Sequence, residues 1–195
     1  MDDAPTLLGM LAVVPDEMIE ERRRLGLDRR DEMWEGVLHM VPPASSAHGE
    51  VENDLGALFR QAAKTRGLRR ISQPGVFDPK VPGMTSYRVP DLAYARPADV
   101  THRGIEGRAV LVVEVLSPGD DSYEKLPFYR RLGVEELLYV DPTTKAFEVR
   151  RPAGDGWGLV GADADGWTAL ASLEVAFKAA PGRLQVRTAL GIEEV

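Results

Sequence analysis

Short apolar runs, each bounded by turn residues, recur along the chain and predict the strands of a sheet. Residues 109–116 form the clearest run, in which Glu114 is the one charged position. A continuous apolar run of this length is typical of a strand that is buried on both faces. Residues 136–140 form a second such run. Three further segments, which contain more polar residues, are also expected to be strands: residues 69–77, 88–95 and 145–150.

A helical pattern is clearest in residues 47–66. Val51, Leu55 and Phe59 recur at the spacing of one helix face and predict a buried stripe. Gly67 follows at once, and a glycine in this position commonly ends a helix. A helix that carries one apolar stripe is expected to lie flat against a sheet.

Two shorter helices are predicted on either side of it. Residues 15–24 begin with proline and acids and end with arginines, which suits the two ends of a helix dipole. Pro127 fits only a first turn, so a helix is expected to begin within residues 124–126 and to end at Gly133. Residues 31–41 predict a strand or hairpin.

The order of these elements predicts an α/β protein of the α+β type with a mixed sheet. Residues 1–195 are expected to form a single domain, because the length suits one core and no repeat or linker interrupts the sequence. Residues 1–14 are interpreted as a loosely held lead-in, and the last third as short antiparallel strands.

The composition and charge narrow the function. The chain has no cysteine, which excludes disulfides and thiolate metal sites. No apolar run is long enough to cross a bilayer and the acidic start does not suit a signal peptide, so we expect a cytoplasmic protein. The net charge of −7 lowers the expectation of a nucleic-acid partner. Local arginine clusters nevertheless leave DNA contact open.

Glu114 is the strongest candidate for chemistry. An ionised side chain inside a buried strand costs free energy unless it is paired or binds a metal. Asp91 lies in another predicted strand, and the two carboxylates converge if these strands are neighbours. With the Val115 carbonyl and water, they would form an all-oxygen site of the kind that Mg²⁺ or Mn²⁺ prefers.

Lys125 follows Glu114 by eleven residues, across a tight turn. Beside a metal, its ammonium group can bind a phosphate oxygen or help to activate a water. Two acids and one lysine would then suffice to hydrolyse a phosphodiester. A purely structural Glu114–Lys125 ion pair explains the same two residues without catalysis, and both readings stay open here.

The order and spacing of these residues closely resemble those of the Uma-two family of restriction endonucleases, within the PD-(D/E)XK nuclease superfamily. The resemblance covers roughly residues 15–150. It rests on Gly36, Pro42-Pro43, His48, Pro90-Asp91, Glu114-Val115-Leu116-Ser117-Pro118, Asp121, Lys125, Tyr129, Gly133-Val134 and Asp141-Pro142.

The resemblance implies a restriction-endonuclease-like core, in which the mixed sheet is central and flanked by helices, and it assigns roles to the candidates. Asp91 and Glu114 would be the metal-binding acids. The superfamily pattern places a lysine two residues after the second acid, where this chain has Leu116. Lys125, on the following helix, would take its place as a migrated lysine. Asp121 would orient Lys125 or a metal-bound water.

Other residues near these motifs are given simpler roles. Tyr129 is expected to pack in the core, with its hydroxyl as a possible contact to the site. His48 is interpreted as a helix-start residue or as an auxiliary base. Glu32 and Glu35 are expected to be surface charges. Glu50, Glu52 and Asp54 are expected to be ordinary helix charges, with the alternative that one of them reaches the site from the helix face.

The first functional hypothesis is a Mg²⁺-dependent endonuclease that hydrolyses DNA phosphodiester bonds, with homodimerisation as a plausible arrangement. A second is a non-catalytic module on the same fold that binds nucleic acid or a protein partner. The net negative charge and Leu116 favour this second hypothesis. A third, weaker hypothesis is a metal-dependent enzyme that acts on a small phosphate ester.

Overall fold

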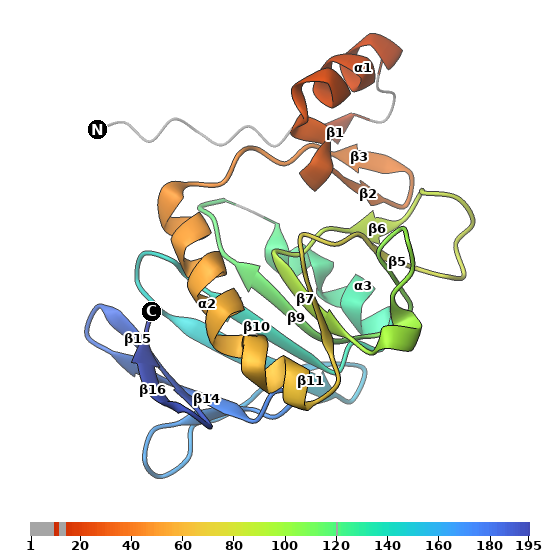
Figure 1. Ribbon diagram of the computed structural model, residues 1–195. Helices are drawn as coiled ribbons and strands as arrows, with labels where there is room; N and C mark the ends of the chain where they lie inside the picture. The colour runs from red at the N-terminus through yellow and green to blue at the C-terminus, as the bar shows by residue number, and fades with distance from the viewer. Residues whose placement is uncertain (1–9, 12–14, 120) are drawn as a thin grey trace.

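A computed structural model describes residues 10–11, 15–119 and 121–195 (Figure 1). Within these residues the chain forms three sheets and three α-helices. The central sheet carries the predicted buried strands in the order β12-β11-β10-β9-β7-β4. Its strands are β4 (Arg69–Ser72), β7 (Leu92–Ala95), β9 (Ala109–Val115), β10 (Glu136–Val140), β11 (Phe147–Ala153) and β12 (Gly156–Leu159).

The central sheet is mixed, as the sequence predicts. Strands β9 and β10 run parallel, and every other neighbouring pair in this sheet is antiparallel. Both parallel strands are buried at every position, which explains their continuous apolar sequences. The predicted fold class, an α+β protein with a mixed sheet flanked by helices, is confirmed.

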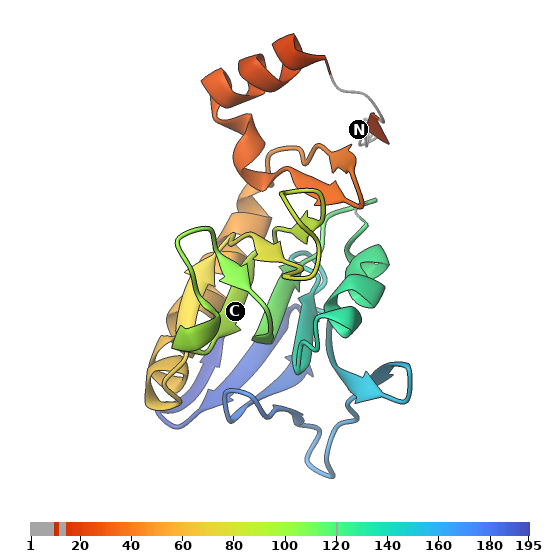
Figure 2. The same cartoon turned by 90° about the vertical axis from the view of Figure 1, so that its right-hand side faces the viewer.

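Helices cover the two faces of this sheet (Figure 2). The long helix α2 (Ser46–Thr65) buries its predicted stripe against one face, together with Leu111 and Val113 of β9. The short helix α3 (Leu126–Arg131) covers the other face, where Val112 lies. Because side chains alternate across a strand, Glu114 shares the α3 face with Val112.

A second, smaller sheet lies beside the end of β9 that carries Glu114. Its order is β1-β3-β2-β6-β5-β8. The strands are β1 (Met10–Leu11), β2 (Glu32–Trp34), β3 (Val37–His39), β5 (Val76–Phe77), β6 (Tyr87–Arg88) and β8 (Ile105–Glu106). Helix α1 (Asp16–Leu25) and the 3₁₀ turn η1 (Leu27–Arg30) precede the β2–β3 hairpin, and two further 3₁₀ turns are η2 (Pro97–Asp99) and η3 (Ser122–Lys125).

The C-terminal third forms an antiparallel sheet, as predicted. Its strands are β13 (Thr168–Leu170), β14 (Val175–Ala180), β15 (Arg183–Thr188) and β16 (Gly191–Glu194). This sheet shares one apolar cluster with α2 and the central sheet. Phe59 of α2 contacts Phe177 of β14 edge to face, with 5.9 Å between ring centroids. The C-terminal sheet therefore supports α2 from behind.

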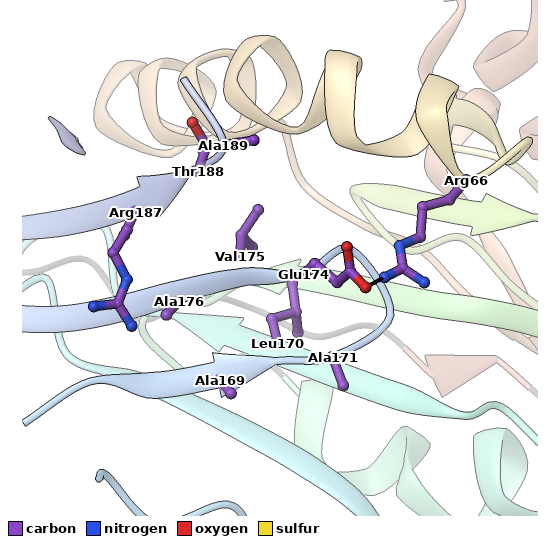
Figure 3. A pocket seen from close by; sticks show the side chains of 10 residues that line it. All are labelled: Arg66, Ala169, Leu170, Ala171, Glu174, Val175, Ala176, Arg187, Thr188 and Ala189. Atoms are coloured by element: carbon purple, nitrogen blue, oxygen red, sulfur yellow. Dashed lines mark ion pairs between the residues drawn. The ribbon is translucent and has the colours of Figure 1, made fainter. Parts of the chain in front are cut away.

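A groove of about 650 Å³ opens where α2 ends against the C-terminal sheet (Figure 3). An ion pair between Arg66 and Glu174 crosses it. At 1.5 Å per helical residue, Arg66 is roughly 27 Å along α2 from His48. The groove is therefore separate from the predicted site. It is lined by Arg66, Ala169, Leu170, Ala171, Glu174, Val175, Ala176, Arg187, Thr188 and Ala189.

Two predicted strands are each divided between sheets, which corrects the sequence analysis. Residues 69–77 form β4 in the central sheet and β5 in the smaller one, and residues 88–95 are divided between β6 and β7. Pro74 and Pro90 lie at the two breaks, and proline cannot donate a hydrogen bond to a neighbouring strand. Asp91 is consequently in a bend before β7 and not within a strand.

The remaining boundaries can be compared directly. The three predicted helices are confirmed within about two residues, with η3 forming the turn that leads into α3. The expected lead-in lies largely outside the described residues, but Met10–Leu11 pairs with β3 as strand β1. That residues 1–195 form one domain stays a prediction. No helix in the described ranges is long and apolar enough to cross a membrane.

Replacing Phe59 with alanine should destabilise the protein by about 3–5 kcal/mol, because the side chain is fully buried between α2, β7 and β14. Urea denaturation monitored by circular dichroism would measure the loss. Leu159→Ala is the matched control, since Leu159 is 63% exposed and its truncation should change the unfolding free energy little. Equal losses in both variants would contradict the predicted core.

Candidate functional site

Glu114 lies buried near the end of β9, on the face that α3 covers. The Tyr129 hydroxyl of α3 donates a hydrogen bond to its Oε1 at 2.7 Å. The Lys125 ammonium lies 3.3 Å from Oε1 and 3.5 Å from Oε2. Burial raises the pKa of Glu114 from 4.5 to about 8, although the Lys125 charge opposes this change. Tyr129 thus packs in the core, as predicted, and also reaches the site.

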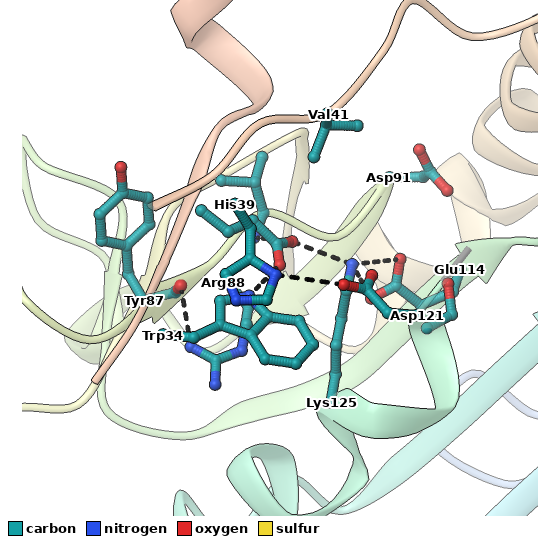
Figure 4. A network of polar contacts seen from close by, with 12 residues as sticks. Trp34, His39, Val41, Tyr87, Arg88, Asp91, Glu114, Asp121 and Lys125 are labelled. Atoms are coloured by element: carbon teal, nitrogen blue, oxygen red, sulfur yellow. Dashed lines mark hydrogen bonds and ion pairs between the residues drawn. The ribbon is translucent and has the colours of Figure 1, made fainter. Parts of the chain in front are cut away.

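Lys125 is buried between two carboxylates. Besides Glu114 it contacts Glu32, whose Oε1 is 2.9 Å from the ammonium nitrogen. Burial by itself lowers the pKa of Lys125, but the charges of Glu114 and Glu32 outweigh this effect and raise it. Lys125 therefore stays protonated over the physiological range. Figure 4 shows its side chain pointing from the start of α3 toward Glu114.

Glu32 corrects the expectation that it is a surface charge. Its exposed fraction is 1%, and every contact of its carboxylate is with a buried or partly buried group. The Val89 amide donates to Oε1 at 2.8 Å, and the Trp34 indole donates to Oε2 at 2.7 Å. The β2–β3 hairpin thus contributes an acid to the site. The sequence offered no signal for this, because strand β2 has only three residues.

Asp91 lies in the bend between the two sheets, where its carboxylate is held from both sides. The Val115 amide donates to Oδ2 at 2.8 Å. Nε2 of His48 lies 2.9 Å from Oδ1. The predicted proximity of the two strands is correct, since β7 and β9 are antiparallel neighbours. Asp91 and Glu114 thus belong to one site, and the charge of Asp91 contributes to the raised pKa of Glu114.

His48 lies in the first turn of α2. Ser45 caps this helix, since its hydroxyl accepts a hydrogen bond from the His48 amide at 3.2 Å. Glu52 follows one turn later on the same buried face. Ligand atoms of His48, Glu52 and Asp91 all lie within 4.8 Å of one another, which makes them a candidate metal-binding cluster. The spacing of four residues between His48 and Glu52 was the signal that could have identified Glu52.

For two residues with predicted roles, Asp121 and Val115, the structure shows contacts other than the predicted ones. Oδ2 of Asp121 lies 3.3 Å from Nδ1 of His39 in the hairpin (Figure 4), so Asp121 links the loop after β9 to β3. Its role in orienting Lys125 stays a prediction. The Val115 amide holds Asp91, and the role of the Val115 carbonyl as a metal ligand also stays a prediction.

Four buried carboxylates lie at the site, and cations partly neutralise them: Arg30 lies 3.7 Å from Glu52, and the buried Arg88 lies near Glu32. The four acids each have an exposed fraction of 8% or less: Glu32, Glu52, Asp91 and Glu114. They lie beside the ammonium of Lys125 and the imidazole of His48. Burial and then the Asp91 charge raise the pKa of Glu52, as the same two effects raise that of Glu114. Clustered anions of this kind are stabilised either by taking up protons or by binding a cation.

The raised pKa of Glu114 predicts a pH-dependent stability in chelator-treated protein. The folded state keeps a proton on Glu114 up to about pH 8, whereas the unfolded chain loses it near pH 4.5. The unfolding free energy should therefore fall across this window, by at most about 1.4 kcal/mol per pH unit. Denaturation of the wild type and of Glu114→Gln would measure it. Parallel pH curves for the two proteins would contradict the prediction.

Solved structures with a similar fold include one from Anabaena variabilis. It is described as a "putative nuclease belonging to DUF820", and it matches with a TM-score of 0.59 at 15% identity. The match covers 74% of this chain and 83% of that one. At this identity the likeness shows a shared fold. No curated protein matches the sequence.

The family comparison is more extensive. A family model described as "Uma2: Putative restriction endonuclease" matches residues 17–184, which include every candidate site residue discussed above. The match spans the central sheet and strands β13 and β14 of the C-terminal sheet. The resemblance seen in the sequence motifs therefore extends over most of the chain, and this protein belongs to the Uma2 family.

Proposed function

We propose that this protein is a metal-dependent endonuclease that hydrolyses phosphodiester bonds in DNA. The observation that carries the proposal is the gathering of four buried carboxylates with the ammonium of Lys125 and the imidazole of His48, at a bend between two sheets. Membership of the Uma2 family and the nuclease-like fold support the reaction class. DNA as the substrate and the metal requirement are parts of the proposal.

The donor groups fit a hard divalent cation. Carboxylate oxygens of Asp91 with Glu52 or Glu114 suit Mg²⁺ or Mn²⁺, and the imidazole of His48 favours Mn²⁺ of the two. A metal held here would supply a Lewis acid that stabilises negative charge on the phosphate and lowers the pKa of a bound water. Asp91 belongs to both arrangements, so it is the residue that either one needs.

The protein residues would have separate tasks in the reaction. A water oxygen forms the new bond to phosphorus while the bond to the leaving sugar oxygen breaks. The water gives its proton to solvent, and the sugar oxygen takes one up. Because Glu114 and Glu32 keep Lys125 protonated, its role is to bind a phosphate oxygen and to stabilise charge in the transition state, and not to act as a base.

The non-catalytic alternative rests on two observations. The net charge is −7, and Leu116 occupies the position at which the superfamily has its lysine. A binding module would need the site only as a buried ion-pair network. Homodimerisation, which would place two sites on the two strands of a duplex, stays a prediction.

Purified wild type should nick plasmid DNA when Mg²⁺ or Mn²⁺ is added and should lose this activity in EDTA. Asp91→Asn and Glu114→Gln should reduce the cleavage rate by about 100-fold or more, and Lys125→Met by a similar factor, because each removes a charged group from the reacting centre. Gel assays of plasmid and single-stranded DNA would measure the rates.

Glu135→Gln is the control for this experiment. Glu135 is a partly exposed carboxylate that pairs with Arg96 and lies beside Ala109, at the opposite end of β9 from Glu114. Its variant should cleave like the wild type. Wild-type cleavage that all three site variants retain would overturn the site. A wild type that binds DNA with a steep salt dependence but never cuts it would favour the binding module.

Metal binding can be measured without activity. Mn²⁺ should raise the melting temperature of the wild type, since a ligand that binds only the folded state stabilises it. Asp91→Asn should abolish the shift. Glu52→Gln and Glu114→Gln identify which neighbour of Asp91 completes the site, because only the variant that lacks a ligand should lose the shift. A full shift in Asp91→Asn would contradict the proposed site.

A further inference from the structure

Glu32 makes the shortest ion pair to Lys125, although it comes from an element that carries no predicted catalytic residue. Its Oε1 is 2.9 Å from the ammonium nitrogen, whereas the nearer oxygen of Glu114 is 3.3 Å away. Glu32 and Lys125 are both almost completely buried. The position of the ammonium group is therefore determined more closely by the hairpin than by the strand that carries Glu114.

The Glu32 carboxylate is itself held in place. The Trp34 indole donates to Oε2 at 2.7 Å, from two residues further along β2. The Trp34 ring in turn stacks on His39 of β3, with 4.1 Å between centroids, and lies against the guanidinium of Arg88 at 4.1 Å. Because β2 pairs with β3 and β6, a rigid sheet carries the group that contacts Lys125.

Glu32 also contacts the segment that carries Asp91. The Val89 amide donates to Oε1 at 2.8 Å, two residues before Asp91 and directly before Pro90. One oxygen of Glu32 thus accepts from the backbone of the Asp91 bend and from Lys125. Three elements that are distant in sequence, β2, the Asp91 bend and η3, are connected through this one carboxylate.

We infer that Glu32 is a positioning residue, which holds Lys125 at a fixed place relative to Asp91 and Glu114. A lysine on the same strand as the second acid would be placed by the strand itself, but here the strand has Leu116 and the lysine reaches in from η3. A long, flexible side chain from another element needs a second anchor, and Glu32 provides it. This inference rests on the proposed nuclease function.

A kinetic cycle tests whether Glu32 acts through Lys125. Glu32→Gln should lower kcat for plasmid nicking by about 10- to 100-fold with KM little changed. Without Glu32 the Lys125 ammonium is no longer held in place, and the substrate loses its contact with this ammonium in the transition state. In a Lys125→Met background the same Glu32→Gln change should cost less than about 2-fold, since coupled residues are not additive. An equal loss of kcat in both backgrounds would overturn the inference.

Two further variants separate placement from folding. Glu35→Gln is the matched control: Glu35 is on the same hairpin but contacts Ser86, Arg88 and Arg131, and its variant should keep wild-type kcat. Trp34→Phe keeps the aromatic ring and removes the donor to Glu32, so it should lower kcat by a few-fold in the same direction. A kcat loss in Glu35→Gln as large as in Glu32→Gln would overturn the inference.

The third readout does not depend on activity. The ¹⁵N–¹H NMR signal of the Lys125 ammonium, identified by its loss in Lys125→Met, should be sharp in the wild type because a buried, paired ammonium exchanges slowly. It should shift and broaden in Glu32→Gln but not in Glu35→Gln. An unchanged signal in Glu32→Gln would overturn the inference even if the wild type is a nuclease.

The two proposals fail in different ways. A wild type that cuts DNA, with Glu32→Gln equal to it in kcat and in the ammonium signal, overturns the role of Glu32 and leaves the nuclease intact. A wild type that cuts no DNA with either Mg²⁺ or Mn²⁺ overturns the proposed nuclease function and, with it, the proposed role of Glu32 in catalysis. Circular dichroism of each variant confirms that a loss is measured on folded protein.

Discussion

The buried ammonium of Lys125 is the interaction on which the site depends. It lies between Glu32 and Glu114, and only the removal of both carboxylates would leave its charge buried without an acidic partner. The cost of burying one charge alone is far larger than the cost of burying a paired set. The hairpin, the central strand and the turn before α3 are therefore held in one arrangement by electrostatics as well as by packing.

The division of two strands between sheets creates the space for this site. The chain leaves the central sheet at Pro74 and enters it again after Pro90. The Gln73 backbone amide donates to the Asp91 carbonyl at 2.8 Å, so the two breaks lie side by side. Had either strand continued in the central sheet, the smaller sheet could not contribute Glu32. The same break turns Asp91 toward His48 and the Val115 amide.

The rest of the molecule supports this end of the sheet from a distance. Helix α2 carries His48 and Glu52 in its first two turns, and its apolar stripe packs against both the central and the C-terminal sheets. That packing fixes the direction of the helix, and hence the place of its first turn. The C-terminal strands thus affect the site through α2, although no candidate ligand lies on them.

The sequence by itself determined the elements whose patterns are local. The continuous apolar runs of β9 and β10, the stripe of α2 and the constraint from Pro127 all correspond to elements of the structure, because each depends on residues close together in the chain. Glu114 was identifiable for the same reason, since a charge within a buried run departs from its own surroundings. The fold class and the family followed from these motifs.

Only the tertiary structure decided which other acids join the site. Glu32 lies in a strand of three residues, and a segment so short has no periodicity from which burial can be inferred. The spacing from His48 places Glu52 on the same face of α2, but only the packing of that face against Asp91 makes it part of the cluster. Whether a carboxylate is a solvated surface charge or a buried partner of Lys125 depends on contacts between distant elements, and no local pattern records those contacts.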